Sequence, residues 1–196
     1  MALVNAIVEG FVDEAVSVRL ISETGHILGA IYGKRGSGYI HRKLSAFNQS
    51  AQGLQYLALV DLMDTGIDCA PIVVQAWLPH PNAGMIFRVA VREIESWLLA
   101  DREGIAEFLA IRTSRIPHFP EREDDPKRTL VNLARRSRRR SIREALVPKA
   151  GSSAATGRLY VSEMCRFIEA QWDVTRARMN SPSLDGSLHR LAALAN

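Results

Sequence analysis

The chain has 196 residues, of which 47% are hydrophobic and 23% charged. This composition is that of an ordinary globular protein, and it excludes collagen-like, fibrous and disordered chains. A chain of this length buries roughly 70% of the surface that it exposes when unfolded, so it needs no disulfide or structural metal to build a core. The formal net charge is +4, from 25 basic and 21 acidic residues, and this small excess by itself identifies no nucleic-acid partner.

Apolar runs alternate with helical patterns over the first hundred residues. The apolar runs predict strands over 3–8, 26–32, 56–60 and 85–91. Helical spacing predicts helices over 13–21, 40–51, 70–77 and 92–100. Strands that alternate with helices favour right-handed crossovers and a largely parallel sheet. The predicted fold class is therefore α/β, an open and mostly parallel sheet with helices on both faces over residues 1–101.

From Arg102 onward the pattern is helical and interrupted by loops. Helical spacing predicts further helices over 102–111, 126–136, 160–172 and 188–195. We expect residues 102–196 to form an arginine-rich helical cap that packs on the sheet, so that the whole chain is one compact unit.

The two cysteines and the hydropathy pattern bear on the cellular compartment. Cys69 and Cys165 lie far apart without C-x-x-C spacing, which excludes zinc-finger, thioredoxin-like and disulfide-framework patterns. No apolar run approaches the roughly 20 residues needed to span a bilayer, and no basic leader precedes the first strand. We therefore expect a cytoplasmic protein that has no membrane partner.

Carboxylates follow three of the four predicted strands. Glu9 closes the first strand, and Asp61 closes the third, with Asp64 just beyond. Glu93 and Glu95 follow the fourth. The carboxyl ends of neighbouring parallel strands lie about 4.8 Å apart at one sheet edge, so these side chains can converge on one hard divalent cation. Oxygen ligands favour Mg²⁺ or Mn²⁺ over Zn²⁺. The alternative is that these carboxylates cap the N-termini of helices.

Two parts of this pattern resemble known domains. A strand ending in Val8-Glu9-Gly10, with Asp13-Glu14 opening the next helix, and a strand ending in Leu59-Val60-Asp61 resemble the Toprim-like domains. The run 88–101, together with Asp125-Pro-Lys127, resembles a bacterial family known as domain of unknown function 4276, which is related to Toprim nucleases. The resemblance covers most of the chain. It implies that Glu9 assists proton transfer and that Asp61 holds magnesium, and Lys127 joins them as a candidate catalytic residue.

The chain departs from the Toprim pattern at one position. The second aspartate of the family's Asp-x-Asp pair would stand at position 63, which is Met63 here. Asp64, Glu93 or Glu95 must then supply the missing ligand, or the site is degenerate. The candidate metal ligands are Glu9, Asp61, Asp64, Glu93 and Glu95.

Two basic segments are candidates for binding phosphate. The glycine-rich turn 33–38 is no Walker motif, but its backbone N–H groups can face a phosphate. Residues 127–143 carry eight basic side chains and no acidic one, a density that favours contact with a nucleic-acid backbone. In both segments the charges could instead be simply solvated. The candidate nucleic-acid contacts are Lys34, Arg35, Arg135, Arg136, Arg138, Arg139 and Arg140.

These patterns lead to three hypotheses of function. The first is a magnesium-dependent nuclease of DNA or RNA, which by resemblance would accompany an ATPase in a bacterial phage-defence system. The second is a catalytically degenerate Toprim-like scaffold that binds nucleic acid or an acidic protein. The third is a nucleotide-binding or phosphotransfer domain that uses the turn 33–38. No histidine has a serine or cysteine partner in a nucleophile motif, so a hydrolytic triad is not expected.

Overall fold

The computed structural model describes residues 1–194 of the chain, which divides into two compact units. The first unit comprises Met1–Val91 and Ser183–Asn196, and the second comprises Arg92–Pro182. The sequence predicts a boundary after residue 101, ten residues later. The final helix belongs to the first unit, whereas the prediction assigned it to the helical cap.

The first unit contains a four-stranded sheet whose strands are all parallel. Its strands are β1 (Leu3–Val8), β2 (Ile27–Gly33), β3 (Gln55–Asp61) and β4 (Met85–Ala90), and their order across the sheet is β2-β1-β3-β4. The central strands β1 and β3 are buried almost throughout. A strand covered on both faces needs a continuous apolar run, which is why these segments are nearly uniformly hydrophobic. The predicted α/β class, with its parallel sheet and C-terminal helical region, is confirmed and is consistent with a Toprim-like fold.

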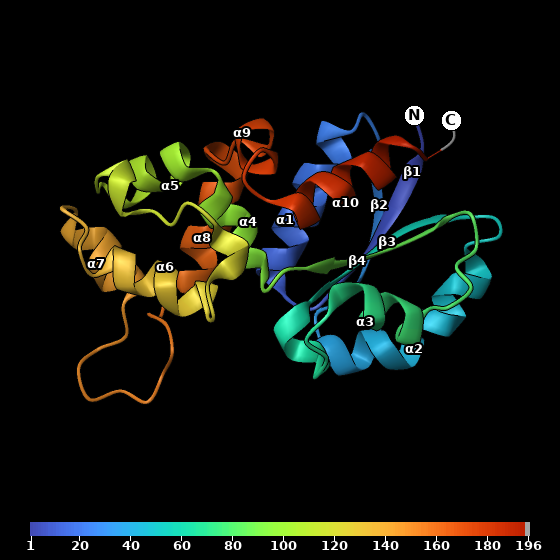
Figure 1. The fold of residues 1–196 in the computed structure, drawn as a ribbon, viewed down its shortest axis with the longest axis horizontal. Coiled ribbons are helices and arrows are strands. Elements are labelled where there is room, and N and C mark those ends of the chain that lie inside the picture. The colour runs from blue at the N-terminus through green and yellow to red at the C-terminus, as the bar shows by residue number, and fades with distance from the viewer. Residues whose placement is uncertain (195–196) are drawn as a thin grey trace. The chain divides into compact units, whose positions relative to one another are not determined.

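Helices cover both faces of this sheet (Figure 1). They are α1 (Phe11–Glu23), α2 (Ser37–Ser50), α3 (Ala70–Trp77) and α10 (Pro182–Ala192). The face under α2 and α3 is filled by an apolar cluster that includes Ile40, Leu44 and Val73. The opposite face carries α1 and α10, and His26 Nε2 binds the carbonyl oxygen of Leu191 in α10 at 2.9 Å. The helix α10, near the end of the chain, therefore contacts the residue that precedes β2, near its start.

A close approach of backbones holds the glycine-rich turn beside the end of β1. Gly33 has a φ of +102°, and a Cβ there would lie 2.2 Å from the carbonyl oxygen of Val8, so only glycine fits. The amide of Lys34 donates to Val8 O at 2.8 Å, and the amide of Gly36 donates to Glu9 O at 3.2 Å. The turn 33–38 is thus fixed next to Glu9.

The second unit is helical. It contains α4 (Ile94–Ala100), α5 (Arg102–Leu109), α6 (Pro126–Ala134), α7 (Arg140–Leu146), α8 (Tyr160–Ala170) and α9 (Val174–Arg178). Every residue of α4 is buried, and this helix packs against α5, α6 and α9. Its carbonyl at Trp97 accepts a hydrogen bond of 3.3 Å from Nε1 of Trp172. Because α4 is buried on all sides, the close packing around it fixes the direction of each of its side chains.

Three helices differ from the sequence predictions. The short helices α7 and α9 are not predicted, and α10 begins at Pro182 instead of residue 188. Ala195, the last residue of the predicted helix 188–195, lies outside the described residues. Within residues 1–194, no helix has the length and apolar character that crossing a bilayer requires.

Candidate metal and phosphate site

In the first unit, the ends of the adjacent strands β1 and β3 are joined through a carboxylate. Glu9 follows β1, and its Oε1 accepts a hydrogen bond of 2.8 Å from the backbone amide of Asp61, the last residue of β3. The predicted neighbourhood of Glu9 and Asp61 is therefore present. Glu9 binds the backbone of Asp61, so the glutamate also holds the strand end in position.

Glu9 has a strongly perturbed pKa. Burial of the side chain is the largest cause, and it raises the pKa from 4.5 to about 8 against the opposing effect of the Asp61 amide. The carboxylates of Asp13 and Asp64 raise it further through their charge, and Asp64 also acts through a side-chain hydrogen bond. Asp64 thus faces Glu9, whereas Met63 is exposed. A cluster of mutually repelling carboxylates is stabilised either by a bound proton or by a bound cation.

This pKa shift predicts how stability depends on pH. The folded protein keeps a proton on Glu9 that the unfolded chain releases, so Glu9 lowers stability progressively as pH rises from about 4.5 to about 8. Glu9→Gln keeps the acceptor for the Asp61 amide but cannot ionise. We expect the variant to melt at a higher temperature than the wild type at pH 9, and at nearly the same temperature at pH 5, in EDTA.

Glu23→Gln, at an exposed site on α1, is the matched control, because the same amide replaces a glutamate whose surface ion pair with Arg19, at 3.4 Å, contributes little to stability. Its melting difference from the wild type should be small at every pH. A Glu9→Gln difference that does not change between pH 5 and pH 9 contradicts the assigned shift.

In the second unit, two predicted metal ligands meet the predicted catalytic lysine. Lys127 Nζ, on α6, lies 3.2 Å from Glu93 Oε1 and 3.6 Å from Glu95 Oε1. The backbone amide of Lys127 also donates to Glu93 Oε2 at 3.0 Å. From α8, the hydroxyl of Tyr160 donates to Glu95 Oε1 at 2.9 Å. One lysine therefore bridges two carboxylates that come from the start of α4.

Glu95 is the most deeply buried carboxylate of this group, with 1% of its surface exposed. Burial raises its pKa to about 7, and the charge of Glu93 adds to the rise, while Lys127 and Tyr160 oppose it. Glu95 Oε2 has no hydrogen-bond partner among the described residues. A buried oxygen without a partner is costly, so this atom needs either a proton or a ligand.

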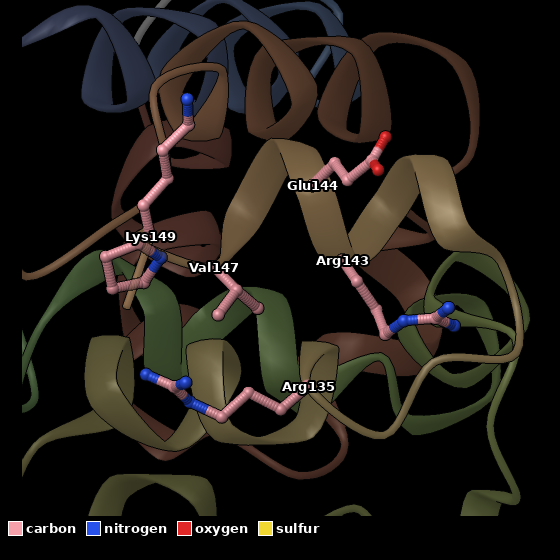
Figure 2. Close-up of a pocket in the computed structure, with 6 residues that line it drawn as sticks. Arg135, Arg143, Glu144, Val147 and Lys149 are labelled. Atoms are coloured by element: carbon pink, nitrogen blue, oxygen red, sulfur yellow. The ribbon is translucent and has the colours of Figure 1, made fainter. Parts of the chain in front are cut away.

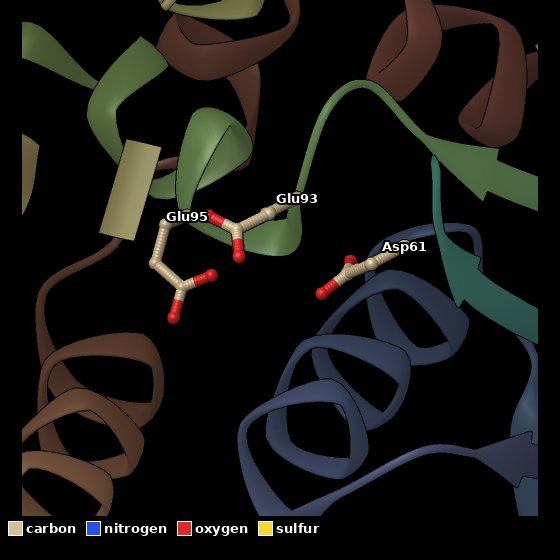
Figure 3. A group of neighbouring side chains, drawn as sticks. All are labelled: Asp61, Glu93 and Glu95. Carbon is tan, nitrogen blue, oxygen red and sulfur yellow. The ribbon is translucent and has the colours of Figure 1, made fainter. Parts of the chain in front are cut away.

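Three buried carboxylates have the chemistry to hold a divalent metal ion: Asp61, Glu93 and Glu95 (Figure 3). Asp61 comes from the end of β3, and both glutamates come from the segment that opens α4. Carboxylate oxygens without sulfur or imidazole are the ligands that Mg²⁺ and Mn²⁺ prefer. The unpartnered oxygen of Glu95 fits this assignment, because a cation would satisfy it.

The basic residues of the turn 33–38 have partners within the first unit. Lys34 Nζ lies 2.7 Å from Glu14 Oε2 and 5.0 Å from the centre of the Phe11 ring. The guanidinium of Arg35 lies 5.7 Å from the ring centre of Tyr39. The turn is beside Glu9, as a phosphate contact requires, but its lysine charge is shared with a carboxylate.

The arginine run does not form one helix. Arg135, Arg136 and Arg138 lie between α6 and α7, Arg139 precedes α7, and Arg140 begins it. All five are exposed. Arg135, Arg143 and Lys149 line an open pocket of about 740 Å³ together with Glu144 and Val147 (Figure 2). Of the five arginines, Arg135 alone lines this pocket, so the predicted nucleic-acid contacts do not gather around one concave surface.

Two polar residues near these carboxylates have no counterpart among the predicted site residues. Tyr160 binds Glu95 from 65 positions away, and no sequence signal points to it. Asp13 raises the pKa of Glu9, and its place in the first turn of α1, directly after the strand end, could have suggested this. Comparison with known proteins found no matching family model, no matching curated protein and no matching solved structure.

Proposed function

We propose that the protein is a divalent-metal-dependent hydrolase of phosphodiester bonds in DNA or RNA, with Mg²⁺ or Mn²⁺ as its cofactor. The observation that carries this proposal is the presence of three buried carboxylates, Asp61, Glu93 and Glu95, with only oxygen ligands to offer. Burying carboxylates is costly, and a hard cation that neutralises them gives a physical reason for the arrangement.

Few residues of the chain separate the strand partner of Asp61 from Glu93. Asp61 is the register partner of Ala90, the last residue of β4. Glu93 follows Ala90 by three residues, a span of at most about 11 Å for an extended chain. We infer that both units offer carboxylates to a hard cation: Asp61, with Glu9 beside it, in the first unit, and Glu93 with Glu95 in the second.

The roles of the protein's own groups follow from their charge. When bound, the cation would neutralise charge on the scissile phosphate and lower the pKa of water. Glu9, with a pKa near 8, holds a proton at neutral pH and can exchange it, as a general acid or base must. The ammonium group of Lys127 orients Glu93 and Glu95 and adds positive charge next to them.

The exposed arginines supply the affinity for substrate in this proposal. Arg135, Arg136 and Arg138–Arg140 are exposed and belong to a run without acidic residues. Arginine binds phosphate through forked, bidentate hydrogen bonds, and contacts of this type bind a backbone irrespective of sequence. We propose that they hold the nucleic-acid backbone while the carboxylates act on it.

The experiment is a cleavage assay on plasmid and single-stranded DNA and on RNA, with Mg²⁺, with Mn²⁺ and with EDTA. We expect cleavage with either metal, none in EDTA, and a loss of at least roughly tenfold in Glu93→Gln. Glu107→Gln, at an exposed position of α5, is the matched control and should cleave like the wild type. Cleavage that persists in EDTA, or that Glu93→Gln leaves intact, overturns the proposed mechanism.

A second candidate function is a scaffold that binds nucleic acid or an acidic protein without cleaving it. Met63, at the position of the second Toprim aspartate, favours this alternative, because it offers no ligand for a hard cation. The same assay separates the two functions. A protein that retards DNA or RNA in a salt-dependent manner, but leaves it intact with either metal, is the scaffold.

A further inference from the structure

The first unit contains a pocket that the proposed hydrolase site does not use. It lies along β4, which is an edge strand, and has a volume of about 460 Å³. Its wall consists largely of apolar side chains from α3 and the following segment, among them Val74, Leu78 and Pro79, with Val89 from the strand. This volume and the apolar lining lie within the range of small-molecule sites in proteins.

Arg88 of the edge strand β4 is the one basic residue that lines this pocket among the described residues. Its guanidinium is half-buried, and its Nε donates to Ser187 Oγ of α10 at 3.1 Å. Among residues 1–194, no carboxylate forms an ion pair with Arg88. The neighbouring charge is that of Arg190, and burial together with this like charge lowers the pKa of Arg88. Arg88 is therefore a partly desolvated cation whose protein partner is neutral.

The surrounding structure makes room for this cation. A Cβ at Gly186 would lie 2.8 Å from Arg88 Nη2, so the absence of a side chain there lets the guanidinium lie against α10. Holding a charge out of water without a counter-charge is costly, and natural proteins usually pair such a group. An anion brought by a ligand would remove this cost.

We propose that the pocket binds a small organic carboxylate with an apolar body. The carboxylate pairs with the guanidinium of Arg88, for which bidentate geometry is favourable, and Arg190 adds attraction for the same anion. The hydrocarbon part lies against Val74, Leu78 and Val89. A nucleic-acid backbone fits this site poorly, because its hydrated phosphates gain nothing from an apolar wall.

The test is calorimetric titration of the full chain with octanoate, which combines a carboxylate with a hydrocarbon chain. We expect saturable binding at one site. Acetate has the charge without the chain, and 1-octanol has the chain without the charge, so each should bind at least tenfold more weakly. Failure of octanoate to bind saturably overturns the proposal and leaves the hydrolase proposal untouched, since the two sites share no residue.

Two substitutions locate the binding. Arg88→Met keeps most of the side-chain volume and removes the charge, and Val74→Trp fills the pocket without changing a charge. Each should weaken octanoate binding at least tenfold. Arg42→Met, at an exposed position of α2, is the matched control for loss of an arginine and should bind like the wild type. Unchanged octanoate binding in both pocket variants overturns the proposal. Should Arg88→Met fail to fold, Val74→Trp alone decides.

Discussion

Asp61→Asn is expected to weaken the binding of Mn²⁺ by roughly 100-fold or more and to abolish metal-dependent cleavage. Removing an outer contact of a metal ligand typically costs about 10- to 100-fold in affinity, so the loss of a direct ligand should cost at least the upper end of this range. An amide in place of the carboxylate keeps the size of the side chain but removes the anionic oxygen that a hard cation requires.

The substitution should leave the fold intact. Glu9 accepts its hydrogen bond from the backbone amide of residue 61, and this group is present in the variant. The end of β3 should therefore stay attached to the end of β1. Circular dichroism and the melting temperature in EDTA check this before the metal titration is compared.

Mn²⁺ titration by calorimetry is the direct measurement, with Asp68→Asn as the matched control. Asp68 is an exposed aspartate of the same unit, so its substitution removes the same charge from the protein surface. The affinity of the Asp68→Asn variant for Mn²⁺ should stay within about twofold of that of the wild type, since long-range charge effects are screened at physiological salt. If the Asp61→Asn and Asp68→Asn variants bind Mn²⁺ with equal affinity, Asp61 is not a ligand of the metal ion.

Asp101→Asn is expected to destabilise the second unit by about 3 kcal/mol. Asp101 is completely buried between α4 and α5, and each of its oxygens accepts two hydrogen bonds. Its Oδ1 is 2.8 Å from Arg176 Nε, and its Oδ2 is 2.9 Å from the amide of Asp173. Breaking one partner of a buried ion pair costs about 3–5 kcal/mol, and the partial exposure of Arg176 argues for the lower end.

Urea denaturation followed by circular dichroism measures this loss as a lower midpoint of unfolding. Glu144→Gln is a suitable control, because Glu144 forms an exposed ion pair with Arg140, at 2.6 Å, on the surface of the same unit. Exposed pairs contribute at most about 1 kcal/mol, so this midpoint should hardly move. Equal shifts for the two variants would show that the interactions of Asp101 are no stronger than those of a surface pair.

The parallel sheet could be predicted from sequence because a strand that is buried on both faces consists of a continuous run of apolar residues. The runs at Leu3–Val8 and Gln55–Asp61 are almost purely apolar, and no amphipathic helix has such a pattern. The carboxylates at their ends could be predicted for the same reason, since a polar residue directly after a buried strand lies at the sheet edge. Glu9 beside the Asp61 amide is the result.

Polar contacts across long stretches of sequence could not be predicted. Asp101 and Arg176 are 75 positions apart, and nothing in either local pattern indicates the other. The start of α10 was missed because its first two turns are polar on the side facing β4, where Ser187 binds Arg88. The helix α7 could not be predicted because its buried apolar residues are few and stand among arginines. They are Ile142, Ala145 and Leu146.

The return of α10 to the sheet makes the first unit discontinuous in sequence. The ribosome completes all of Arg92–Pro182 before it makes the helix whose Ser187 and Leu191 bind Arg88 and His26. During synthesis, the second unit can therefore fold while one face of the sheet carries α1 but still lacks α10. Domains generally fold as units in the order of their synthesis, but here the N-terminal unit is the last to be completed.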